Sequence, residues 1–301
     1  MKRFFSLLLC FCLLICVGCA QQQSNEDGAL HILATTYPIY LFTKSLTEGI
    51  EGVEVTQLID ETVSCLHDYT LTVPDMKAIE RADIIILNGV DLESFMEDAL
   101  DRTDAVTIDC SQGIDLLPAD GHEHHRHEED DHHHGHYDPH YWLDAEAVPT
   151  IISNILIGLS ASDKAHVEEY HANFSAVMDR IPSLTFDASS LSCPYLITFH
   201  DGFRYLAHDN GLTLLKSIEE EEGSTASAAD IKEIVALIRE YNIPAIFTEK
   251  YGSDKTAQTI ARETGVKVYQ LDMLMSGEGQ DISTYFDAIN ANYAIIREAL
   301  S

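Results

Sequence analysis

The sequence predicts an α/β protein of two lobes, each a mainly parallel four-stranded sheet with flanking helices, joined by a long rigid helix. Its 301 residues are enough for two domains of about 150 residues each. Short β-rich runs alternate with helical segments in the first half of the chain and again in the second half. Such alternation indicates parallel strands connected by helical crossovers. A largely polar stretch with apolar residues at helical spacing separates the two halves.

Local signals mark where the elements of the first half begin and end. Pro38 stands in the first turn of one expected helix, and Gly49 follows its last residue. Thr72 is a helix N-cap candidate, and Asp75 adds an acidic side chain to the first turn of that helix. The apolar run after residue 82 ends in a turn, which indicates a strand buried on both faces. We expect strands over 31–36, 53–59, 82–89 and 105–109, and helices over 38–48, 72–81 and 92–100.

The second half repeats this alternation after a connecting helix. Apolar or aromatic residues at 167, 170, 174 and 177 fall on one helical face, and Pro182 then ends that helix. Ser227 and Asp230 have the spacing of a capping box. We expect strands over 195–199, 212–215, 245–248 and 267–271, and helices over 203–208, 228–241, 255–264 and 282–300. The first lobe is expected over 30–160, the linker helix over 161–185 and the second lobe over 186–301.

The first residues indicate export rather than a folded element. Met1-Lys2-Arg3 is basic, and the apolar run over 4–17 is shorter than the roughly 20 residues of a transmembrane helix. The small-residue-then-Cys ending resembles a bacterial lipobox, although Cys16 stands where such boxes usually carry Leu, Val or Ile. We therefore expect a signal peptide over 1–18, a lipid on Cys19 and a tether over 19–29. The protein is then anchored outside the cytoplasm, on the outer face of the cell membrane or on its periplasmic side.

Composition and charge limit the function. With 18 Lys+Arg against 50 Asp+Glu, the formal net charge is −32. We expect no nucleic-acid binding, because it depends on basic side chains that displace counterions from phosphates. Besides the lipidated Cys19, the mature chain keeps three cysteines (Cys65, Cys110 and Cys193), whose spacing names no disulfide pair. We expect buried thiols.

Eight of the 15 histidines lie in one short segment, interleaved with carboxylates. Such a composition cannot form a packed core, so we expect a mobile loop over 119–136. Imidazoles and carboxylates are ligands for Zn²⁺ and similar ions, which favours an accessory metal-binding role over an accidental polar tract. The loop histidines are His122, His124, His125, His127, His132, His133, His134 and His136.

A specific metal site requires ligands on a rigid frame, and parallel sheets bind ligands at the carboxyl ends of their strands. His200 and Asp272 directly follow two expected strands, and His67 follows a third by a short loop. His140 lies where the chain leaves the histidine-rich loop. Three imidazoles and one carboxylate suit four-coordinate Zn²⁺.

Each member of this set has an alternative. A single histidine at a strand end is more often a hydrogen-bonded or surface residue than a ligand. Glu249 also ends a strand and is the rival carboxylate, while Cys65 stands two residues before His67. A water molecule is a further candidate for the fourth ligand. We interpret His31, His166, His171 and His208 as ordinary residues.

Several segments, in order along nearly the whole mature chain, resemble the metal-binding lipoproteins that supply zinc or manganese to ABC importers. The most specific are Asp138-Pro139-His140-Tyr141-Trp142-Leu143-Asp144 and Phe199-His200-Asp201-Gly202-Phe203-Arg204-Tyr205-Leu206. The others are 67–69, 72–76, 82–85, 246–249 and 271–272.

The resemblance implies one metal ion in the cleft between the lobes, bound by His67, His140, His200 and Asp272. Manganese members tend to have a glutamate where His200 stands, so zinc is expected and Mn²⁺ is the runner-up. The implied partners are an ABC permease and its ATPase, with a monomeric protein held at the membrane by its lipid.

Two other classes of function remain open at this point. A zinc hydrolase needs an open water position and a general base, a role in which Glu249 could serve. The sequence has no H-E-x-x-H motif, so we expect no enzyme. A surface adhesin or metal sensor is the other alternative.

Overall fold

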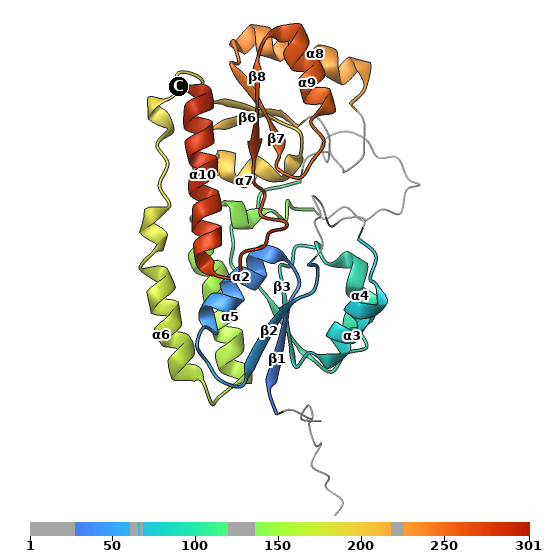
Figure 1. The fold of residues 1–301 in the computed structure, drawn as a ribbon, viewed down its shortest axis with the longest axis vertical. Helices are drawn as coiled ribbons and strands as arrows, with labels where there is room; N and C mark the ends of the chain where they lie inside the picture. Colours follow the sequence, from blue (N-terminus) through green and yellow to red (C-terminus); the bar gives the residue numbers. More distant parts are fainter. Residues whose placement is uncertain (1–27, 61–65, 67–68, 120–135, 218–225) are drawn as a thin grey trace, which may run out of the picture.

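The computed structural model describes residues 28–60, 66, 69–119, 136–217 and 226–301. The predicted signal peptide, Cys19, Cys65 and His67 lie outside the described residues, as do all histidines of the loop except His136. Within the described ranges, no helix is both long and apolar enough to cross a membrane. Figure 1 shows two α/β lobes stacked along the long axis of the molecule.

The amino-terminal lobe contains a parallel sheet in the strand order β2-β1-β3-β4. The sequence of β3 is apolar because this strand lies inside the sheet, where both faces are covered. Thr72 and Asp75 form the reciprocal capping box that begins α3. The elements are β1 (Leu30–Ala34), α2 (Tyr37–Leu46), β2 (Val53–Gln57), α3 (Val73–Arg81), β3 (Ile84–Leu87), η1 (Ser94–Met96), α4 (Glu97–Leu100) and β4 (Val106–Asp109).

The carboxyl-terminal lobe repeats the arrangement, with parallel strands in the order β6-β5-β7-β8. Ser227 and Asp230 form the predicted capping box of α8, which ends at the left-handed residue Asn242. The predicted fold class is confirmed. The elements are β5 (Tyr195–Thr198), η5 (Asp201–Phe203), α7 (Arg204–Asp209), β6 (Thr213–Ser217), α8 (Ala228–Tyr241), β7 (Ala245–Glu249), α9 (Lys255–Thr264), β8 (Lys267–Leu271) and α10 (Ile282–Leu300).

The segment between the lobes differs from the single helix expected over 161–185. Helix α5 (Val148–Ser162) ends where that helix should begin, and α6 (Val167–Met178) is only 12 residues long. Asp163 separates them, because its carboxylate accepts hydrogen bonds from the side chains of His166 and Tyr170 and closes a turn. After α6 the chain continues through the short turns η3 (Ile181–Ser183) and η4 (Ala188–Ser190).

Helix α10 is the element that contacts both lobes. It runs beside β8 and reaches down to α2 (Figure 1). The ring of its Tyr285 packs against Phe42 at 4.8 Å, and the Tyr285 hydroxyl donates to the carbonyl oxygen of Trp142. Trp142 belongs to η2 (Tyr141–Leu143), between the lobes. One hydrophobic cluster of the described residues therefore extends from the first sheet through α10 into the second lobe, which also holds a separate cluster around Ile197, Ile234 and Ile246.

Candidate metal centre

His140 and His200 lie side by side where the two lobes meet. His200 follows the last residue of β5 by two positions, and His140 immediately precedes η2. Their ring centroids are 5.2 Å apart with an interplanar angle of 89°, and each residue is 4% exposed. Two of the four predicted ligands are thus brought together, from segments 60 residues apart in the chain.

The orientation of the His140 ring is set by Asp138. One carboxylate oxygen, Oδ1, accepts from both the backbone N–H of His140 at 2.9 Å and its Nδ1 at 2.7 Å. Because an ionised carboxylate only accepts hydrogen bonds, Nδ1 carries the proton and the lone pair lies on Nε2. A carboxylate behind the imidazole is the arrangement found for most metal-ligating histidines.

His200 has a comparable carboxylate neighbour. Its Nδ1 lies 3.6 Å from Oε1 of Glu249, the last residue of β7, which is an ion-pair distance longer than a hydrogen bond. Both side chains are buried. Glu249, the rival carboxylate of the sequence analysis, therefore lies behind the imidazole of His200.

Gly202 permits the two imidazoles to approach each other, and the sequence patterns did not single it out for this role. A Cβ atom on Gly202 would lie 3.1 Å from Cδ2 of both His140 and His200, and 2.3 Å from the end of the Met273 side chain. The backbone oxygen of Met273 in turn accepts from Nε1 of Trp142 at 2.9 Å. Loops of both lobes are thereby packed around the histidine pair.

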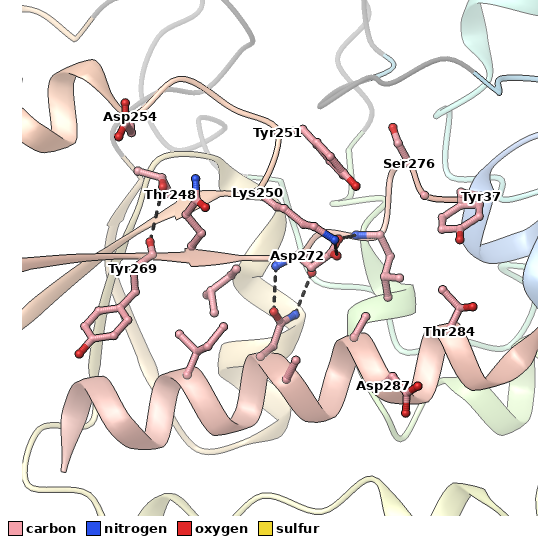
Figure 2. Close-up of a pocket in the computed structure, with 18 of the residues that line it drawn as sticks. Tyr37, Thr248, Lys250, Tyr251, Asp254, Tyr269, Asp272, Ser276, Thr284 and Asp287 are labelled. Carbon is pink, nitrogen blue, oxygen red and sulfur yellow. Dashed lines mark hydrogen bonds and ion pairs between the residues drawn. The ribbon is translucent and has the colours of Figure 1, made fainter. Parts of the chain in front are cut away.

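Asp272, the predicted carboxylate ligand, is bound to other partners. Its Oδ2 lies 2.9 Å from Nζ of Lys250, and its Oδ1 accepts from the backbone N–H of Leu274. Asn292 of α10 holds the Asp272 backbone through a donor and an acceptor. Figure 2 shows Lys250 directed at Asp272 in the wall of a cavity of about 1040 Å³. The hydrogen bond to Asp272 raises the pKa of Lys250, which therefore stays charged.

The remaining predicted ligand, His67, lies outside the described residues, as does Cys65. Within the part of the chain that the structure describes, no three His, Cys, Asp or Glu side chains are arranged to hold a metal ion. Of the predicted site, the structure therefore describes His140 and His200 together, and Asp272 in its pair with Lys250.

The buried cysteines and several of the remaining histidines have contacts outside the histidine pair. Cys110 and Cys193 are buried thiols, as expected, and burial raises the pKa of Cys110 well above its ordinary value. His31 pairs with Glu54, and His166 pairs with Asp163. His136 is exposed at the base of the predicted loop, where its carbonyl oxygen accepts from Ala119.

Two parallel α/β lobes are typical of a solute-binding protein. The paired imidazoles at their junction are side chains that bind metal cations. The chain belongs to the family described as zinc-uptake complex component A periplasmic, whose sequence model matches residues 32–299. The family is a component of metal uptake and not an enzyme, which removes the hydrolase alternative.

Individual relatives agree with this placement. The high-affinity zinc uptake system protein ZnuA of Bacillus subtilis is 30% identical over 310 aligned positions, covering 98% of this chain and 96% of the relative. A crystal structure of ZnuA superposes with a TM-score of 0.75 at 25% identity, over 91% of this chain and all of that one. Zn(II)-bound AdcA from Streptococcus pneumoniae gives 0.74 at 25% identity, over 91% of this chain and 58% of the longer AdcA.

Proposed function

We propose that this protein captures Zn²⁺ between its lobes and delivers it to an ABC importer. The observation that carries the proposal is the buried pair of His140 and His200, with Asp138 hydrogen-bonded to Nδ1 of the first and Glu249 3.6 Å from Nδ1 of the second. Imidazole nitrogens are preferred ligands of Zn²⁺, and a carboxylate hydrogen-bonded behind the ring, as Asp138 is to His140, orients the ligand and strengthens the donor. Membership of a zinc-uptake family supports the same cargo.

The proposed ligand set is His67, His140, His200 and Asp272. Asp272 can join only if it exchanges Lys250 for the metal ion, since the two side chains form an ion pair. Glu249, Cys65 and water are the alternatives for the fourth position, and Glu249 already contacts His200. If Asp272 does join, the oxygen ligand favours the runner-up, Mn²⁺, more than a purely imidazole site does.

The sequence indicates where the protein would act and with which partners. A lipid on Cys19, after removal of the signal peptide 1–18 and with 19–29 as a tether, would hold the monomeric protein outside the cytoplasm beside the permease and its ATPase. The histidines of 119–136 would collect ions for the cleft. The structure ties the two ends of this segment together, because Pro118 and Tyr137 form an antiparallel bridge directly before Asp138.

The test is a count of bound metal. Protein starting after Cys19, with residues 119–136 replaced by a short linker, is purified without metal and loaded with zinc under manganese competition. Native mass spectrometry should detect one tightly held zinc ion, which the variant His200→Ala loses and the exposed-site control His208→Ala keeps. Binding of manganese in preference would reverse the choice of cargo. Loss of all tight binding with the loop would show that the histidine pair is not the site.

A further inference from the structure

Asn88 contacts both chain neighbours of His140. It follows β3 directly and is fully buried. Its Nδ2 donates to the carbonyl oxygen of Pro139 at 3.1 Å, and its backbone carbonyl oxygen accepts from the Tyr141 hydroxyl. The residues on either side of His140 are therefore held by a single asparagine, which lies 51 residues from Pro139 in the sequence.

Asn88 is itself held by the buried carboxylate of Glu93. The backbone N–H groups of Asn88 and Gly89 donate to the two oxygens of Glu93 at 2.7 and 3.0 Å. The Thr35 hydroxyl, at the end of β1, donates to the same carboxylate at 2.6 Å. Hydrogen bonds thus connect the central strands of the first sheet, through Glu93 and Asn88, to the backbone around His140.

The loop between Asn88 and Glu93 has an unfavourable backbone conformation. Gly89, Val90 and Asp91 all have positive φ angles, of 85°, 58° and 58°. A branched residue such as valine is rarely found in this region, so the surrounding contacts must hold it there. The hydrogen bonds that the Glu93 carboxylate accepts from the backbone N–H groups of Asn88 and Gly89 supply such contacts.

The Asn88 amide makes only one of its two possible kinds of hydrogen bond. Its Oδ1 is buried and accepts no hydrogen bond from the described residues. Buried acceptors without a donor destabilise a fold. An apolar side chain would avoid this defect, but it would lose the Nδ2 donor that holds Pro139.

We propose that Asn88 is a positioning residue for metal binding, which holds the Pro139 carbonyl and the Tyr141 hydroxyl on the two sides of His140 and so sets where its imidazole stands relative to His200. This inference rests on the proposed function, because placement of the imidazole affects affinity only if His140 binds the ion. Groups that orient ligands from behind commonly change metal affinity by about 10–100-fold.

The test compares Asn88→Ala with Asn154→Ala. Asn154 in α5 also bridges two carbonyl groups, those of Cys110 and Gln112, but within the described part of the chain it forms no hydrogen bond to the residues around His140. For each purified protein, zinc affinity is measured against a chromophoric chelator, the visible spectrum of the Co²⁺ form is recorded, and the melting temperature is determined without metal. Asn88→Ala should bind zinc about 10-fold more weakly with an altered Co²⁺ spectrum, whereas Asn154→Ala should retain both properties.

A second variant separates placement from folding. Tyr141→Phe removes only the hydroxyl bond to Asn88, and it should weaken zinc binding by a smaller factor, about 3-fold, with a melting temperature near that of the parent protein. Parental affinity and spectrum in both Asn88→Ala and Tyr141→Phe would overturn the inference. So would an equal loss of affinity in Asn154→Ala, since affinity would then follow stability. A parent protein that holds no zinc would overturn the proposed function itself.

Discussion

Lys250 forms an ion pair with Asp272, with Nζ and Oδ2 2.9 Å apart. The lysine side chain is half exposed, whereas the aspartate is largely buried. A cation of the protein therefore occupies the carboxylate that the sequence assigns to the metal (Figure 2). Zinc binding through three imidazoles leaves this pair intact, whereas binding of a metal by Asp272 requires that Lys250 leave Oδ2.

Removal of the lysine charge should shift selectivity toward manganese. In Lys250→Gln, the carboxylate of Asp272 loses its partner and becomes available to an oxygen-preferring ion. We expect the ratio of Mn²⁺ to Zn²⁺ affinity to rise by roughly 3–10-fold, measured by competition in native mass spectrometry. Lys216→Gln is the control, because Lys216 forms a surface pair with Glu233 at 2.8 Å. Equal ratios in the two variants would show that Lys250 has no influence on the site.

Neutralising Asp138 should weaken zinc binding while the fold is preserved. Asp138→Asn has the same shape, but it removes the negative charge behind His140 and no longer enforces one tautomer. A loss of about 10–100-fold in affinity is expected from calorimetric titration. Asp163→Asn is a matched control, since Asp163 accepts from His166 at 2.6 Å in an equivalent pair. A loss of the same size in that control would point to a general effect of charge.

A methyl group at residue 202 should separate the two imidazoles. In Gly202→Ala the new Cβ requires movement of Met273 and of both histidine rings, so zinc affinity should fall by about 10-fold or more. Gly113→Ala is informative as a control, because Gly113 has a positive φ of 77° and open space around it. That control should lower the melting temperature and leave zinc affinity unchanged. Undiminished affinity in Gly202→Ala would contradict the packing described for the pair.

Asp209 makes stability depend on pH. Burial and the neighbouring Asp144 raise the pKa of Asp209 to about 7, from about 3.9 in an unfolded chain. The folded state therefore binds this proton more tightly, and its contribution to stability is present below pH 3.9 and is lost as the pH rises to about 7. Asp209→Asn should raise the melting temperature at pH 8 by roughly 2–4 °C and leave it nearly unchanged at pH 4. A uniform shift at both pH values in differential scanning calorimetry would refute this assignment.

Elements with signals in their own residues were predictable from the sequence. The capping box at Ser227 and Asp230 begins α8 where expected, and α8, α9 and α10 have the predicted bounds. Helix α5 was not predicted, although its buried apolar residues from Val148 to Leu159 recur at helical spacing and Pro149 stands in its first turn, where proline is favourable. The expected linker helix was too long, because the turn at Asp163 depends on tertiary contacts of its side chain.

The candidate site was predictable in its ligands more than in their surroundings. His140 and His200 stand at loop and strand-end positions, which sequence patterns can locate. The roles of Asn88, Gly202 and Lys250 arise from contacts with residues distant in the chain, and no local pattern marks them. The pairing of Asp272 with Lys250 shows the same limit, since residue type alone does not tell which of two cations a carboxylate binds.

The continuous core under both lobes has a consequence for how the cargo leaves. Hinged proteins open by separating domains that have independent cores. In this protein, separation of the lobes would break the contact between Tyr285 and Phe42 and expose both rings to water. The two lobes should accordingly melt in one cooperative transition, and neither should resist proteolysis when produced alone. Discharge of the ion then requires local movement of the loops that carry the ligands, while the frame that joins them remains intact.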